Sequence, residues 1–123
     1  MTKFKAQNFK TRITNARHGL ELAMRAEKNL RFHAIISGLV VLAGFILDVG
    51  HVKMCILLLA IAIVILTEMV NSAIEFTLDA LYKNKYSRLV KFAKDISAGA
   101  VLFVSIIAII IGVLIFIPAL IDV

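Results

Sequence analysis

Residues 54–79 decide the fold of this chain, and they read MCILLLAIAIVILTEMVNSAIEFTLD. The half from Met54 to Leu66 is an apolar run, and the half that follows carries three acids and an amide: Glu68, Asn71, Glu75 and Asp79. At about 100° per residue, these four fall within about 80° of one another on one face of a helix. Carboxylates inside a membrane span are costly and therefore indicate a functional site. The alternative is a solvated carboxylate face on a helix that leaves the bilayer.

The composition indicates a small integral membrane protein. Of the 123 residues, 61% are hydrophobic, and the mean hydropathy is +0.95, which excludes an ordinary soluble domain. We predict one all-α domain over residues 1–123, with membrane spans at about 32–50, 54–82 and 96–117, the last closed by Pro118. At about 1.5 Å per residue the second span would reach ~44 Å, whereas a hydrocarbon core is ~30 Å thick. Its polar end must therefore project from the membrane.

Basic residues predict the orientation of the chain. Residues 1–33 hold eight of the fourteen lysines and arginines and residues 83–94 hold five more, whereas the connector 48–53 holds only Lys53. By the positive-inside rule both basic regions lie in the cytoplasm, so the first connector and the carboxyl terminus lie outside. The net charge of +6 is thus a signal of topology. No basic patch is interleaved with aromatic residues, so nucleic acid is not an expected partner.

The segment from about 12 to 31 predicts an amphipathic helix on the cytoplasmic membrane surface. Its apolar positions recur at helical spacing between basic flanks: Ile13, Ala16, Leu20 and Met24. Glu27 continues this apolar stripe, where an acid is misplaced for a simple membrane anchor. Either Glu27 pairs locally with Arg31 at i+4, or it points into the bundle toward the carboxylates of the second span.

A lysine and small residues begin the third span. Lys94 and Asp95 are followed by Ile96 and then by Ser97, Ala98, Gly99 and Ala100. Small side chains let helices approach closely in lipid, so we expect this patch to pack against the carboxylate helix. Lys94 either offers phosphate a compact positive charge with three donors at a helix amino terminus, or simply extends to the membrane interface.

The depths of the acids indicate an order of chemical groups. Counted from Met54, Glu68 lies ~21 Å along the helix, Glu75 ~32 Å and Asp79 ~38 Å. Glu68, inside the membrane, is then a candidate general base beside a lipid hydroxyl, and Glu75 and Asp79, at the cytoplasmic rim, can hold a divalent cation. This order fits phosphate transfer from nucleotide to lipid. The alternatives are a non-enzymatic scaffold or regulatory subunit that pairs with basic spans of a partner, and a cation pathway, which a lysine beside the acids disfavours.

Two motifs resemble a known family. Residues 68–79 read EMVNSAIEFTLD, and residues 93–102 read AKDISAGAVL. They resemble the signature of the small prokaryotic diacylglycerol kinase and undecaprenol kinase family, E-x-x-N-[ST]-A-I-E-x-x-x-D with a downstream A-K-D and a small-residue patch. The resemblance covers nearly the whole chain, including Glu27 and residues 29–33, whereas the G-x-x-x-x-G-K-[ST] loop of many soluble nucleotide-binding proteins is missing.

The resemblance implies a homotrimer of three-span subunits in the bacterial inner membrane, with active sites shared between neighbours. The implied substrates are ATP and a membrane lipid alcohol, and the implied cofactor is Mg²⁺. Glu68 would take the proton of the lipid hydroxyl, while Glu27 and Glu75 would hold Mg²⁺ on the ATP phosphates. The remaining implied site residues are Asp79, Tyr86, Lys94 and Asp95 at the nucleotide, with Lys94 on the transferring phosphoryl group, and Asn71 in a positioning role.

The acceptor lipid is either undecaprenol or diacylglycerol. Residues 31–33 and 97–100 resemble the polyprenol-kinase branch, whereas the diacylglycerol branch has a glutamate at the position of His33. That branch also has an acidic residue and a histidine beside the tyrosine, where this chain has Lys85 and Ser87. We therefore favour undecaprenol. His33 itself is interpreted as an interfacial residue with no chemical role.

Overall fold

The computed structural model describes residues 8–83 and 85–122, which form four α-helices. They are α1 (Phe9–Ala26), α2 (Lys28–Ile46), α3 (His51–Tyr82) and α4 (Arg88–Ile121). No strand occurs in the described residues. The helices α2, α3 and α4 are each long and apolar enough to cross a membrane. The prediction of an all-α membrane fold with three spans after an amino-terminal helix is thereby confirmed.

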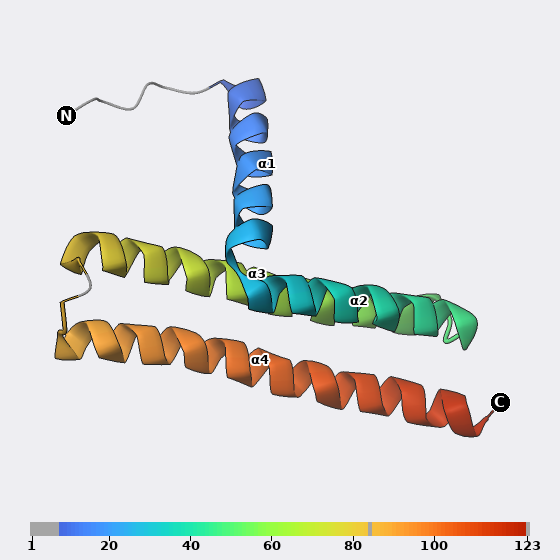
Figure 1. Ribbon diagram of the computed structural model, residues 1–123. Coiled ribbons are helices and arrows are strands. Elements are labelled where there is room, and N and C mark those ends of the chain that lie inside the picture. Colours follow the sequence, from blue (N-terminus) through green and yellow to red (C-terminus); the bar gives the residue numbers. More distant parts are fainter. Residues whose placement is uncertain (1–7, 84, 123) are drawn as a thin grey trace.

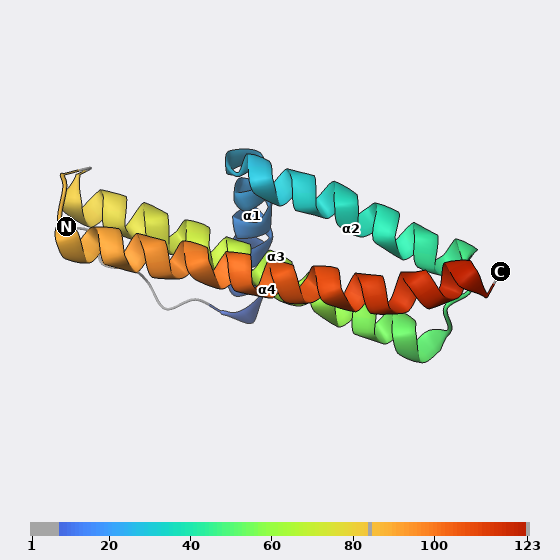
Figure 2. The ribbon, with the colours of Figure 1, turned by 90° about the horizontal axis from the view of Figure 1, so that it is seen from below.

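The three long helices lie alongside one another, and α1 stands across them (Figures 1 and 2). The most extensive contact is between α3 and α4, and α2 packs against α3. α2 has 19 residues, whereas α3 has 32 and α4 has 34. At ~1.5 Å per residue, α2 reaches only ~28 Å, while α3 and α4 reach ~48 and ~51 Å. The ends of α3 and α4 that meet at their connecting loop therefore extend beyond the start of α2 (Figure 1).

The buried face of α3 is a single stripe that includes an acid. Its members recur every three or four residues: Leu57, Ala60, Val64, Glu68 and Ser72. The apolar members form the ordinary packing face of a helix in a bundle. Glu68 continues this face and is only 8% exposed. The predicted base is therefore held on the packing face of α3 by the apolar residues of the turns before it.

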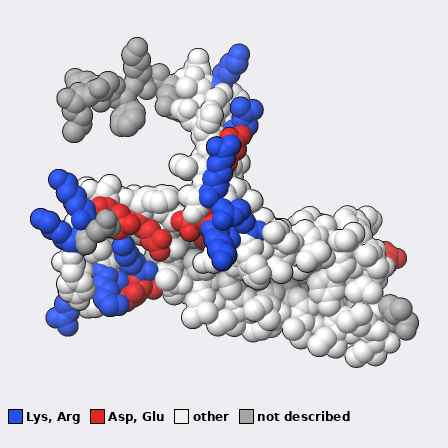
Figure 3. All heavy atoms as spheres, in the orientation of Figure 1, with Lys and Arg blue, Asp and Glu red and all other residues white. Residues whose placement is uncertain are grey.

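Most of the charge lies in one part of the molecule. Charged side chains gather on α1, at its bend into α2, and at the ends of α3 and α4 near their connecting loop (Figure 3). The rest of the face seen in Figure 3 is almost uncharged, and many aliphatic and aromatic side chains of α2, α3 and α4 are exposed on the single chain. A broad apolar belt bordered by charge is what a membrane-embedded chain requires.

The amino-terminal helix differs from the prediction over 12–31 at both ends. It begins at Phe9 and ends at Ala26, because Glu27 adopts an extended conformation (φ −110°, ψ 109°) between α1 and α2. No proline or glycine marks this break. The spacing of the apolar residues therefore predicts a helix that continues past Glu27. Residues 28–31 therefore belong to α2.

The end of the last helix also differs from the prediction. α4 continues through Pro118 to Ile121, so the prediction that this proline closes the helical span is wrong. Proline removes one backbone donor, but the turn that follows still forms, and the N–H of Asp122 donates to the Pro118 carbonyl at 3.0 Å. Near a helix end, the loss of one hydrogen bond is not enough to stop the helix.

Candidate active site

The bend between α1 and α2 is held by backbone and side-chain hydrogen bonds. The N–H of Glu27 donates to the Ala23 carbonyl at 3.0 Å. Nη1 of Arg31 donates to the carbonyls of Met24 and Arg25, at 3.0 and 2.7 Å, which supplies partners for the last carbonyls of α1. Arg31 is thus engaged with the backbone, and no ion pair joins it to Glu27, although both lie in the described part of the chain. The alternative of a local Glu27–Arg31 pair is therefore wrong.

Glu27 instead lines a polar cavity of about 220 Å³, which we call the carboxylate cavity. Its lining comes from α2, α3, α4 and the bend: Glu27, Asn29, Leu30, Glu68, Asn71, Ser72, Glu75, Ala98 and Val101. The cavity thus brings together the predicted base, both predicted metal ligands and the predicted positioning residue. The second interpretation of Glu27, an acid that points toward the carboxylates of the second span, agrees with this placement.

Two oxygen atoms of these residues are buried without a hydrogen-bond partner among the described residues. They are Oε2 of Glu68 and Oδ1 of Asn71. A buried acceptor left without a donor costs roughly 1–3 kcal/mol. The amide of Asn71 makes only a long hydrogen bond, in which Nδ2 donates to Oε1 of Glu75 at 3.4 Å. The site therefore holds acceptors that a substrate hydroxyl or a cation can satisfy.

A second pocket, of about 300 Å³, lies at the loop between α3 and α4, and we call it the loop pocket. It contains the four other predicted ATP-binding residues: Asp79, Tyr86, Lys94 and Asp95, together with Lys85 and Ser87. Nζ of Lys94 donates to Oδ1 of Asp79 at 2.6 Å and so ties α4 to α3. Nζ of Lys91 donates to Oδ2 of Asp95 at 2.7 Å. Both acids of the pocket therefore have a lysine partner, and Tyr86 lies beside them with 82% of its surface exposed.

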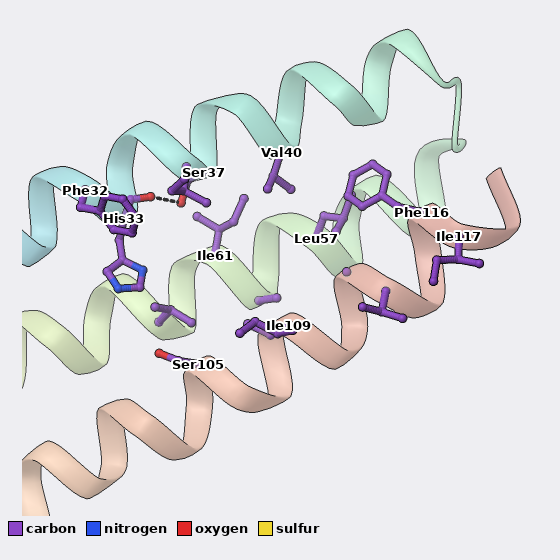
Figure 4. A pocket seen from close by; sticks show the side chains of 16 residues that line it. Phe32, His33, Ser37, Val40, Leu57, Ile61, Ser105, Ile109, Phe116 and Ile117 are labelled. Atoms are coloured by element: carbon purple, nitrogen blue, oxygen red, sulfur yellow. Dashed lines mark hydrogen bonds between the residues drawn. The ribbon is translucent and has the colours of Figure 1, made fainter. Parts of the chain in front are cut away.

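An apolar groove of about 560 Å³ is lined by α2, α3 and α4. Figure 4 shows that it extends from His33 and Ser105 at one end to Phe116 and Ile117 at the other. Apart from His33, Ser37 and Ser105, every lining residue is apolar. From Ser105 to Ile117 the groove follows α4 for about 18 Å at 1.5 Å per residue. Its shape and lining suit a hydrocarbon chain.

His33 connects the apolar groove to the carboxylate cavity. Its Nε2 lies 3.2 Å from Oε1 of Glu68, and the two side chains are 30% and 9% exposed. The interpretation of His33 as an interfacial residue without a chemical role did not anticipate this contact. No signal in the sequence of α2 alone could reveal it, because the contact depends on how α2 docks on α3.

The oxygen ligands of the carboxylate cavity fit a hard cation. Glu27, Glu75 and the amide oxygen of Asn71 are ligands of the kind that Mg²⁺ prefers, and proteins usually hold Mg²⁺ by one or two carboxylates together with substrate phosphates. No group of three or more His, Cys, Asp or Glu side chains that could hold a metal occurs in residues 8–83 and 85–122. The oxygens of the cavity are thus of the type that binds a hard cation, but the described residues do not make an all-protein metal cage.

The small-residue patch of α4 packs only in part as predicted. Ser97 is buried, whereas Ala98, Gly99 and Ala100 are exposed on the single chain, although Ala98 also lines the carboxylate cavity. A helix presents only one face to a given neighbour, so consecutive small residues cannot all meet α3. Asn29, Ser72 and Val101 line the site without having been predicted.

The comparisons with known proteins agree with the predicted family. The model of a family described as prokaryotic diacylglycerol kinase matches residues 14–116. An undecaprenol kinase of Bacillus subtilis is 38% identical over 108 residues, which are 88% of this chain and 87% of that protein. A diacylglycerol kinase of Synechocystis sp. is 32% identical over 104 residues, which are 85% of this chain but only 59% of that protein. The predicted enzyme class, a lipid kinase, is thereby confirmed. Because the family match covers most of its length, the chain belongs to the prokaryotic diacylglycerol kinase family.

Proposed function

We propose that this protein transfers the γ-phosphate of ATP to the hydroxyl of a membrane lipid alcohol, with undecaprenol as the acceptor ahead of diacylglycerol. The observation that carries the proposal is the succession of an apolar groove, a carboxylate cavity and a loop pocket with a lysine. The groove suits a lipid chain, the cavity suits the hydroxyl and a cation, and the loop pocket suits the phosphates of a nucleotide.

Glu68 acts as the general base in this proposal. Its unpartnered Oε2 accepts the proton of the lipid hydroxyl while the hydroxyl oxygen bonds to the γ-phosphorus. The bond between that phosphorus and the oxygen bridging to the β-phosphate breaks, and ADP leaves with the electron pair. Bound Mg²⁺ would supply neutralising charge at the phosphates, and Glu27 and Glu75 would hold it. Asn71 positions Glu75 through its amide.

The nucleotide occupies the loop pocket and reaches toward the carboxylate cavity. Lys94, now paired with Asp79, would neutralise the transferring phosphoryl group, because a lysine ammonium is a compact charge with three donors. Asp79, Asp95 and Tyr86 would contact the remainder of the nucleotide. The proposal places these residues at the cytoplasmic side of a bacterial inner membrane, with the carboxyl terminus outside, in agreement with the gathering of charge at this end of α3 and α4 (Figure 3).

Assembly into a homotrimer is part of the same proposal. Many large apolar side chains of α2, α3 and α4 are exposed on the single chain, and the groove is walled by three helices only. Packing between neighbouring subunits would cover part of this surface and enclose the polar site.

Polyprenol is favoured as the acceptor by the relatives. The undecaprenol kinase matches this chain at higher identity and over a larger share of its own length than the diacylglycerol kinase does. The long apolar groove is compatible with either lipid.

The test measures transfer of radiolabelled phosphate from ATP to undecaprenol and to diacylglycerol, side by side, with purified protein in mixed micelles containing Mg²⁺. We expect both ATP-dependent transfer and a preference for undecaprenol, and we expect Glu68→Gln to abolish transfer. The control is Glu21→Gln, an exposed carboxylate of α1 whose one ion pair among the described residues is with Arg17. Folded wild-type protein that labels neither lipid would refute the proposal, and a preference for diacylglycerol would reverse the choice of acceptor.

A further inference from the structure

We infer that His33 is a positioning residue that holds the carboxylate of Glu68 at the end of the lipid groove. The inference rests on the proposed function of Glu68 as the base, and it adds a role for a residue of α2. Its basis is the 3.2 Å separation between Nε2 of His33 and Oε1 of Glu68, which lies within reach of a hydrogen bond.

The two oxygens of Glu68 have different surroundings. Oε1 faces the imidazole of His33, whereas Oε2 is buried and has no partner among the described residues. With a proton on Nε2, His33 offers this atom to Oε1 at 3.2 Å and leaves Oε2 to accept a proton from substrate. The contact therefore distinguishes an anchored oxygen from a reacting one.

Such an anchor matters because a glutamate head group is otherwise free to turn. The terminal torsion of glutamate has a broad energy profile, so backbone position alone does not orient the carboxylate. A base has to lie within hydrogen-bond reach of the proton that it removes, and a misplacement of about 1 Å can cost about 100-fold in rate. The contact with His33 restricts the torsion that decides where Oε2 lies.

His33 is itself held in place by its neighbours on α2. Its carbonyl accepts a hydrogen bond from the hydroxyl of Ser37 at 2.6 Å, and its ring meets the ring of Phe32 edge to face, with centroids 5.9 Å apart. Phe32, His33 and Ser37 all line the apolar groove (Figure 4). The same imidazole is thus a wall of the groove and a partner of the base, so a hydroxyl at the end of a chain in the groove lies close to Glu68.

The first test compares two substitutions of His33. His33→Leu keeps an apolar wall but removes the donor, and we expect kcat for lipid phosphorylation to fall about 10- to 100-fold. KM for ATP should stay within about twofold, because the loop pocket is untouched. His33→Gln keeps an N–H donor and should retain most of the wild-type kcat. The matched control is His18→Leu, the same substitution at an exposed histidine of α1, which should behave like the wild type.

The second test observes the contact without activity. The side-chain ¹⁵N resonances of His33 should shift in the Glu68→Gln variant, while those of His18, exposed on α1, should not. Wild-type kcat in His33→Leu, equal losses in the Leu and Gln variants, or an unchanged His33 resonance would overturn the inference. Wild-type protein inactive on both lipids would refute the proposed function, while the resonance would still decide whether the contact exists.

Discussion

Substitution of Lys94 by methionine tests whether this lysine mainly stabilises the fold through its ion pair with Asp79 or mainly stabilises the transferring phosphoryl group. The pair is short, at 2.6 Å, but its side chains are 36% and 41% exposed. Partly exposed pairs contribute about 0.2–1 kcal/mol and are weakened by salt, so Lys94→Met should lower the free energy of unfolding by no more than ~1 kcal/mol. Loss of a charge that stabilises the transferring phosphoryl group should instead lower kcat about 100- to 1000-fold, or ~2.7–4 kcal/mol.

The assay pairs steady-state phosphorylation with thermal unfolding of the same preparation. A charge swap, Lys94→Asp with Asp79→Lys, restores opposite charges between α3 and α4 but moves the ammonium to the other helix. We expect it to recover the melting temperature and leave kcat low. Arg17→Met, which breaks an exposed pair on α1, serves as the control for loss of a surface ion pair. Wild-type kcat in either Lys94→Met or the charge swap would refute the reasoning.

Substitutions at three further places have defined outcomes: the cation ligands, the bend after α1, and the contact between α2 and α3 at Gly44. Glu27→Gln and Glu75→Gln should each raise KM for Mg-ATP by about 10-fold in an ATP titration at fixed Mg²⁺, and two unchanged values would contradict the cation site. Arg31→Ala removes both side-chain hydrogen bonds to the end of α1 and should cost about 1–2 kcal/mol in thermal unfolding, so an unchanged melting temperature would count against the role of Arg31 at the bend. Gly44→Ala puts a Cβ 2.6 Å from the Cε at the flexible end of Met54 and should leave the free energy of unfolding nearly unchanged. Gly44→Leu should lower that free energy by about 1–3 kcal/mol. Equal melting temperatures for the two variants would show that Met54 does not limit the size of the side chain at position 44.

The spans and the carboxylate face could be predicted because they depend on local periodicity. The spacing of Glu68, Asn71 and Glu75 puts them on one side of any helix, and the structure places them in one cavity. The four other predicted nucleotide-binding residues, Asp79, Tyr86, Lys94 and Asp95, also gather in one pocket, because the loop between α3 and α4 is short and brings both helix ends together. In both cases a pattern along the chain was enough.

Contacts between separate helices could not be predicted in the same way. No helix-stop residue marks the break at Glu27. The break is instead stabilised by the side chain of Arg31, which donates hydrogen bonds to the last carbonyls of α1. The contact between His33 and Glu68 depends on the docking of α2 on α3, which a hydrophobic pattern does not specify. The helix continues beyond Pro118 although the proline removes one backbone donor, so the residue type alone did not predict where the helix ends.

The groove lies between three helices that are each long and apolar enough to cross a membrane, so a lipid chain reaches it from within the bilayer. A lipid alcohol that binds there arrives by lateral diffusion, so the enzyme senses a two-dimensional concentration, the mole fraction of acceptor in the surrounding lipid. Dilution of the membrane with inert phospholipid would then slow the reaction even when the total amount of acceptor per volume is constant. In the proposed reaction ATP, in contrast, would arrive from bulk water. The two proposed substrates would thus obey different units of concentration.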